Sequence, residues 1–177
     1  LGPLAVTVRS PVQIAIALQT VAAAMPERSV HVALGTSSVT VARWHDRSRA
    51  GAADLLVAAV RDVGELLGGG RVNGFRLSQP PEPRPTITAA AFGPRAVAAA
   101  YGADRMVLNM VTAATAGRLA AEHPNTAVWL AAAIDPTDDE RAWLSRGFVG
   151  YLAAPGYAEM FEEAGFEELV AHARSEE

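Results

Sequence analysis

The stretch from Thr86 to Asn109 constrains the fold of this chain more than any other. It contains two short apolar runs rich in Ile, Val, Ala and Leu, separated by the pair Gly93 and Pro94. Apolar runs of this length are typical of the buried strands of a parallel sheet. Proline suits the first position of a helix, because its missing N–H is no loss there. The stretch therefore predicts a strand, a tight turn, a helix and a second parallel strand.

The same alternation between strand-like and helix-like spacing of apolar residues recurs along the chain. Further strands are expected at Leu4–Val8, Val30–Leu34 and Thr126–Asp135, and helices after Ser10, at Ala50–Leu67, at Ala113–Glu122 and throughout the segment that follows Asp135. The polar segment from Thr36 to Arg49 is expected to be a loop. This alternation predicts a single α/β domain with a parallel sheet and right-handed crossovers, either doubly wound or curled into a barrel.

Composition narrows the classes of function. The chain has 177 residues, 50% of them hydrophobic, which suffices for a sizeable core. A net charge of −4 argues against a nucleic-acid partner, which would need a concentrated basic stripe. There is no run of 18 apolar residues, so no membrane partner is expected. Cysteine and lysine are both absent, so thiolate metal sites, thiol nucleophiles and Schiff-base lysines are excluded. The absence of cysteine fits a cytoplasmic protein, and no His, Asp or Glu spacing indicates a metal site.

The residues expected at the carboxyl ends of the strands are hydroxyls, amides, glycines and one arginine. Both architectures bind ligands at these ends. Few of these side chains titrate near neutrality, so they suit a phosphorylated cofactor better than acid–base hydrolysis. Gly93 lets backbone come close to a ligand, and the amides at the following helix start are expected to hold a phosphate.

Four segments together resemble the luciferase-like monooxygenase superfamily, and most closely its branch dependent on the deazaflavin coenzyme F-420. They are the opening LGPLAVTVRSP, ALGTSS followed by ARWHDR, AAFGPRAVAAAYGADRMVLN, and YLAAPGYAEMFEEAGF. The resemblance spans nearly all of the chain, with its segments in the expected order. The sequence departs from the family at Asp46, where glycine usually follows the Trp-His pair.

The resemblance implies part of a TIM (β/α)8 barrel that binds a flavin or deazaflavin at its carboxyl end. It also implies hydride transfer between coenzyme F-420, or alternatively FMN, and a small organic substrate in a homodimeric enzyme. Residues 1–177 would be one domain that holds strands three to seven and lacks strands one, two and eight, so we expect a piece of a longer protein. Carried over to this sequence, the resemblance assigns cofactor binding to four segments. In strand three it assigns Pro3 and Leu4, after Gly2, and beside the ring and ribityl chain it assigns Gly35, Thr36, Ser37 and Ser38. Around the phosphate it assigns Phe92, Gly93, Pro94 and Arg95, and next to the ring it assigns Asn109.

Neither the residues nor the resemblance identifies a catalytic acid or base. Trp44 and His45 are expected to pack and to close the loop rather than to form a catalytic pair, and His123 is expected to be solvated. Two alternatives to an F-420-dependent enzyme remain open besides an FMN-dependent monooxygenase. One is a non-catalytic flavin-binding protein on a shortened barrel, and the other is an inert dimeric fragment that binds nothing.

Overall fold

The computed structural model describes residues 3–130, 132–154 and 156–175. The chain divides into two compact units, which are treated separately below. The first unit comprises Leu1–Val107 with Asn125–Ala127, and the second comprises Leu108–Pro124 with Val128–Glu177. No helix among the described residues is both long enough and apolar enough to cross a bilayer.

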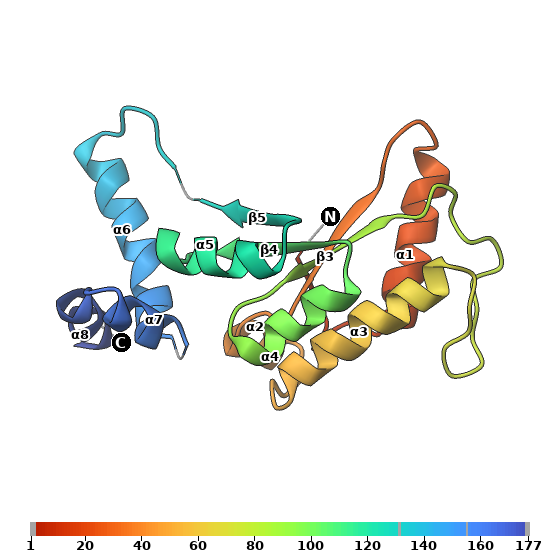
Figure 1. The fold of residues 1–177 in the computed structure, drawn as a ribbon, viewed down its shortest axis with the longest axis horizontal. Helices are drawn as coiled ribbons and strands as arrows, with labels where there is room; N and C mark the ends of the chain where they lie inside the picture. Colours follow the sequence, from red (N-terminus) through yellow and green to blue (C-terminus); the bar gives the residue numbers. More distant parts are fainter. Residues whose placement is uncertain (1–2, 131, 155, 176–177) are drawn as a thin grey trace. The chain divides into compact units, whose positions relative to one another are not determined.

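The fold is α/β, built on one five-stranded sheet (Figure 1). The strands are β1 (Leu4–Ala5), β2 (His31–Gly35), β3 (Thr86–Ala90), β4 (Arg105–Asn109) and β5 (Thr126–Trp129). They lie in the order β1-β2-β3-β4-β5, and the pairs β1–β2, β2–β3 and β3–β4 are parallel. The expected parallel sheet is therefore confirmed.

The strand order bears on the choice between the two expected architectures. Each strand lies beside the next one in the chain, with no reversal of direction across the sheet. Successive right-handed crossovers in one direction bring every connecting helix to the same face, as in a barrel. A doubly wound sheet needs a point at which the order reverses. The five strands are therefore compatible with part of a barrel.

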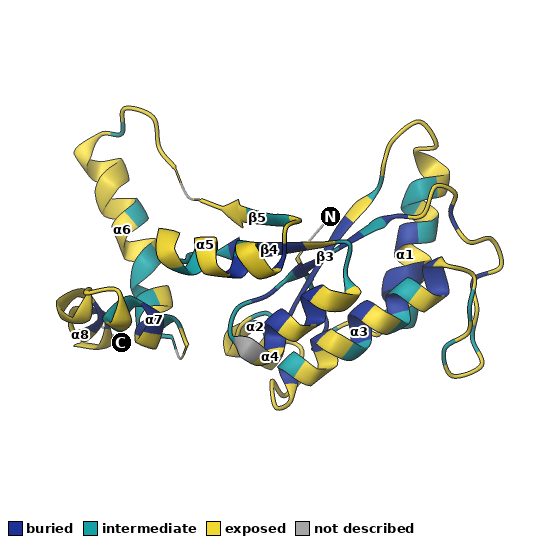
Figure 2. Cartoon of the chain, in the orientation of Figure 1, coloured by how far each residue is buried: buried dark blue, intermediate teal, exposed yellow. Residues whose placement is uncertain are grey.

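In the first unit, helices cover one face of the sheet. They are α1 (Pro11–Ala24), α3 (Ala52–Leu67), and the single turn α4 (Pro94–Val97), which continues as a 3-10 helix, η1 (Ala98–Gly102). A Cβ added at Gly64 of α3 would lie 3.7 Å from Cδ1 of Ile87 in β3, so α3 packs directly on this strand. Figure 2 shows buried and exposed residues alternating along α1 and α3, as expected for helices with one face in the core.

The ends of both long helices follow from the sequence. Ser10 caps α1 in a capping box with Gln13, whose backbone N–H donates to Oγ of Ser10 at 3.3 Å. Helix α3 buries one stripe that includes Leu56 and Val63, and it ends at the first of three glycines, Gly68. The amphipathic pattern therefore predicted these two helices to within about two residues.

Three elements differ from expectation. Strand β1 ends at Ala5, because the chain turns there and the amide of Arg9 already donates to the carbonyl of Ala5 at 3.0 Å. Strand β5 ends at Trp129, and two large apolar residues beyond it are exposed, Leu130 (77%) and Ile134 (94%). The segment expected to be a loop contains the short helix α2 (Val39–Trp44), capped by Ser38.

The second unit is mostly helical. It contains α5 (Ala113–Glu122), α6 (Asp138–Leu152), α7 (Tyr157–Glu163) and α8 (Glu167–Ser175), of which the last three pack on one another. Val170 of α8 and Met160 of α7 are buried, whereas α6 has no buried residue. The helical character expected after Asp135 is confirmed for most of this segment.

Candidate functional site

In the first unit, the carboxyl ends of β2 and β3 lie at one edge of the sheet. Gly35 of β2 is paired in parallel with Ala90 of β3, so the residues that follow them leave the sheet side by side. We call residues 35–38 and 91–95 the rim. Ligands of parallel α/β folds bind at such an edge. The structure thus brings together the two segments expected to line the ring and to hold the phosphate.

Pro3 and Leu4 approach the same edge. Leu4 pairs with Leu34, and a Cβ added at Gly35 would lie 3.4 Å from Cβ of Pro3 and 3.4 Å from Cβ of Ala90. A methyl group at Gly35 would therefore be in ordinary van der Waals contact with Pro3 and with Ala90. Gly2, expected in the same bulge, lies outside the described residues.

The segment after β2 is held by hydrogen bonds from two directions. The Thr7 hydroxyl donates to the Thr36 carbonyl at 3.2 Å. From the other direction, Arg49 donates through Nε to the Ser37 carbonyl at 2.5 Å and through Nη2 to Oγ1 of Thr36 at 2.9 Å. Ser37 has a φ of 61°, an uncommon conformation for a residue with a side chain. These bonds fix the two residues that were expected to face a cofactor ring.

Ser38 has a structural task. Its Oγ accepts a hydrogen bond from the backbone N–H of Val41 at 3.2 Å, which caps α2. Its hydroxyl proton still has to find an acceptor, so capping leaves Ser38 able to donate to a ligand. Thr36 and Ser37, which follow β2 directly, are half-buried, whereas the next residue, Ser38, is exposed.

The turn after β3 is open. Gly93 has a φ of 81°, and a Cβ built on it would meet no atom within 4 Å. Positive φ explains the glycine here, because other residues adopt it only at a cost. Phe92 is half-buried and Arg95 is exposed. Among the described ion pairs none involves Arg95, so its guanidinium is free to meet an anion.

The helix expected after this turn is shorter than the sequence suggested. One α-helical turn, Pro94–Val97, passes into the 3-10 helix that ends at Gly102. Helix dipoles build up over aligned peptide units, so a single turn supplies little of one. Any anion at this turn would depend on local amides and on Arg95. The helix-dipole part of the sequence argument is therefore weaker than expected.

Asn109 belongs to the second unit, so it is described with that unit rather than with the rim. It lines a cavity of about 470 Å³ together with Met110 and residues of α6. Aromatic side chains dominate the α6 part of the lining, which includes Trp143, Phe148 and Tyr151. Tyr151 also packs edge-to-face on Tyr157, with ring centroids 5.8 Å apart.

Three residues at and directly after the end of α2 bear on the Trp-His pair. Trp44 is 75% exposed, so the expectation that it packs is wrong. His45 ends α2 and its backbone N–H donates to the Ala42 carbonyl at 3.1 Å, which confirms its loop-closing role. Asp46 adopts a φ of 54°, the left-handed conformation that favours glycine. The departure from the family pattern therefore falls at a position where the backbone itself prefers glycine.

Two further expectations are corrected or extended. His123, expected to be solvated, is only 9% exposed. Arg49 was not among the expected site residues, although it holds two of them. No local motif marks it, since its partners are 12 and 13 residues away in the sequence.

A comparison of the chain with protein-family models, with curated proteins and with solved structures found no match.

Proposed function

We propose that this chain is the cofactor-binding part of a luciferase-like oxidoreductase, which transfers hydride between coenzyme F-420 and a small organic substrate. In this proposal the five strands are strands three to seven of a TIM (β/α)8 barrel. The observation that carries it is the open turn at Gly93, which lies at the carboxyl end of β3 beside the segment that follows β2.

The rim residues fit the phosphorylated end of such a coenzyme. Gly93 offers backbone with no side chain in the way, and Arg95 adds a guanidinium, which binds phosphate through two parallel N–H groups. The fixed Thr36 and Ser37 supply polar groups one strand away. Held at both points, the coenzyme would span the carboxyl ends of β2 and β3.

When bound, the coenzyme supplies the hydride chemistry through its ring. The contribution of this chain is binding and orientation. Arg49 keeps Thr36 and Ser37 in place. Preorganised positioning of this kind accounts for a large part of many rate enhancements. The rim itself contains no His, Asp or Glu, so it assigns no proton donor or acceptor.

The preference for the deazaflavin over FMN comes from the resemblance of the quoted segments and from a composition rich in alanine and arginine. A homodimer is part of the same proposal. A non-catalytic flavin-binding protein would use the same rim, and it differs only in the turnover that follows binding.

The test is a spectroscopic titration of the purified chain with coenzyme F-420 and, separately, with FMN. Gly93→Asp is compared with Gly93→Ala, because both variants share the backbone strain of positive φ and only the first adds a negative charge. Two unit charges 4 Å apart interact by about 1 kcal/mol in water and about 4 kcal/mol near a protein surface. We therefore expect Gly93→Asp to weaken binding roughly fivefold or more relative to Gly93→Ala.

Equal affinities of the two variants would show that the phosphate does not lie at this turn. Absence of binding by the wild-type chain to either coenzyme would contradict the proposed function itself. Binding of FMN in preference to F-420 would retain the site and replace the cofactor.

A further inference from the structure

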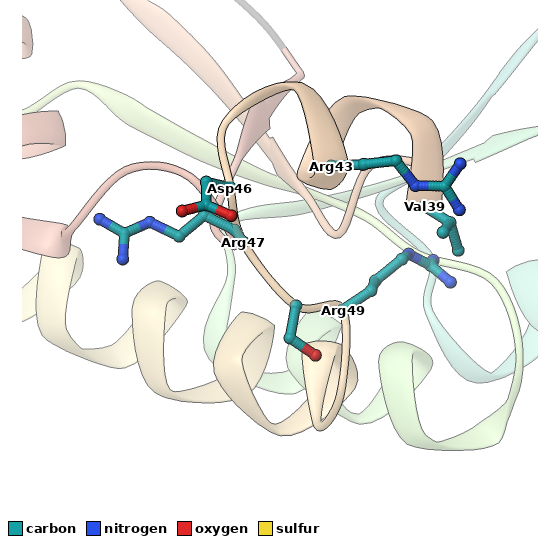
Figure 3. A pocket seen from close by; sticks show the side chains of 6 residues that line it. Val39, Arg43, Asp46, Arg47 and Arg49 are labelled. Atoms are coloured by element: carbon teal, nitrogen blue, oxygen red, sulfur yellow. The ribbon is translucent and has the colours of Figure 1, made fainter.

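A second polar cavity lies in the first unit, in the segment that joins α2 to α3 (Figure 3). Its volume is about 380 Å³, within the range of sites for small molecules. It is lined by Val39, Arg43, Asp46, Arg47, Ser48 and Arg49. We call it the arginine cavity.

The lining carries an excess of positive charge. The lining contains three guanidinium groups and a single carboxylate, that of Asp46. Within the described part of the chain, no ion pair joins Arg43, Arg47 or Arg49 to an acidic side chain. In a chain with a net charge of −4, this concentration of unpaired arginine is a local exception. Guanidinium groups are well suited to bind phosphate and carboxylate oxygens in pairs.

Two of the arginines extend in the same direction. Figure 3 shows the side chains of Arg43 and Arg49 on the same side as Val39, whereas Arg47 and Asp46 lie on the other side. The carboxylate is therefore closer to Arg47 than to the other two guanidinium groups in this view. An oxyanion between Arg43 and Arg49 would meet two cations and the apolar surface of Val39.

The backbone that carries these side chains is well fixed. The amide of Arg47 donates to the Ala42 carbonyl at 2.9 Å, and the amide of Asp46 donates to the Arg43 carbonyl at 3.0 Å. These two bonds, with Asp46 in the left-handed conformation, form a Schellman motif at the end of α2. Arg49 is fixed as well, through its bonds to Thr36 and Ser37. Less side-chain and loop freedom is then lost when an anion binds.

We propose that the arginine cavity binds the phosphate group of a small molecule, with Arg43 and Arg49 as its direct ligands and Arg47 as a longer-range contributor. The site is built from a different set of residues from the turn at Gly93. The proposal does not depend on the redox function. Two sources would present the same chemistry to the arginines. One is a separate phosphorylated metabolite, and the other is the coenzyme proposed above, whose phosphate would then lie here and not at Gly93.

Isothermal titration calorimetry with inorganic pyrophosphate at low salt tests the site directly. The key variant is Arg43→Gln, because no described hydrogen bond holds this side chain and its loss should leave the fold intact. Its matched control is Arg61→Gln, since Arg61 already pairs with Asp62 at 2.8 Å. Loss of a hydrogen bond to a charged group costs about 1.5–3 kcal/mol, so we expect Arg43→Gln to weaken binding about tenfold or more and the control to leave it unchanged.

A second variant changes affinity in the opposite direction. Asp46→Asn keeps a residue that tolerates the left-handed conformation and removes the only carboxylate of the cavity. Exposed charge interactions amount to about 0.2–1 kcal/mol, so this variant should tighten pyrophosphate binding by about 1.4-fold to fivefold. Circular dichroism spectra of all variants verify that each one is folded.

The proposal is overturned if the wild-type chain does not bind pyrophosphate, or if Arg43→Gln and Arg61→Gln bind it equally well. Competition identifies the source of the phosphate. Displacement of pyrophosphate by coenzyme F-420 would assign the cavity to the coenzyme, and simultaneous binding would assign it to a separate ligand. Because Gly93→Asp should leave pyrophosphate binding unchanged, failure of the proposed function and failure of this site can be told apart.

Discussion

Replacement of Asp104 by alanine should be among the most damaging changes of a single polar residue in the first unit. Asp104 lies just before β4 and its Oδ2 accepts a hydrogen bond from the backbone N–H of Ile87 in β3 at 2.7 Å. Its Oδ1 accepts from Nη2 of Arg84, and its own amide donates to the Ile87 carbonyl at 2.9 Å. One carboxylate thus ties the amino ends of β3 and β4 together.

The expected cost follows from burial. Ile87 is 1% exposed, so its N–H would be left without an acceptor in the interior, which costs about 1.5–3 kcal/mol for a bond to a charged group. The ion pair with Arg84 adds at most about 1 kcal/mol, because the two side chains are 41% and 33% exposed. We expect Asp104→Ala to lower the free energy of unfolding by about 2–3 kcal/mol. Asp104→Asn keeps an acceptor oxygen and should cost about 1 kcal/mol.

Urea denaturation followed by far-UV circular dichroism measures these losses. Asp138→Ala is the matched control, since this carboxylate is fully exposed and its loss should leave the unfolding midpoint nearly unchanged. The reasoning would be refuted if Asp104→Ala unfolded at the same urea concentration as Asp138→Ala.

Two further predictions concern helix ends. Asp46→Gly should raise the free energy of unfolding by about 0.5–1 kcal/mol in the same urea assay, because glycine adopts the left-handed conformation without steric cost, and a loss of stability would contradict the Schellman geometry. At α6, the carboxylate of Glu140 accepts hydrogen bonds from the backbone N–H of Thr137 and from the Thr137 hydroxyl. These bonds, the backbone one more than the hydroxyl one, hold the pKa of Glu140 below the usual glutamate range. Because the pKa of Glu140 is lower in the folded state than in the unfolded state, its contribution to stability is fully present above the unfolded-state pKa. This contribution is lost as the pH falls through the folded-state pKa. Thr137→Val keeps the backbone bond and removes the hydroxyl bond, so it should raise the pKa of Glu140 part of the way in an NMR titration. An unchanged pKa would show that the hydroxyl does not donate to Glu140 in solution.

Much of the fold could be predicted from the sequence where one signal dominates. Helix α5 runs from Ala113 to Glu122, as expected, because Thr112 caps it and a single helical period continues to Glu122. Strands β2 and β3 were predicted to within about one residue, since short apolar runs in a parallel sheet have few alternatives.

Other elements depend on partners that are distant in the sequence. Helix α2 begins with three β-branched residues, Val39, Thr40 and Val41, which disfavour helix. It exists because Ser38 caps one end and a Schellman motif closes the other. The run after Thr126 has the composition of a buried strand, but Leu130 is exposed and lies beyond the end of β5. The apolar composition of a segment alone does not show whether a neighbouring strand is present to cover that segment.

The candidate site divides in the same way. The positive φ of Gly93 was predictable, because a tight turn between a strand and a helix commonly needs a residue in this conformation. The role of Arg49 was not, since it acts on Thr36 and Ser37 across a loop that no periodicity describes. Arg43 and Arg47 line the same cavity as Arg49 because α2 ends in a sharp turn at Asp46.

The most direct test of the proposed cofactor site is a ¹H–¹⁵N correlation spectrum of the labelled chain, recorded during titration with coenzyme F-420. The account predicts that the largest shifts occur at the carboxyl edge of the sheet, in the amides of Thr36, Ser37, Gly93 and Arg95. Shifts confined to the opposite edge, at residues such as Thr86 and Arg105, or a spectrum that does not change at saturating coenzyme, would contradict it.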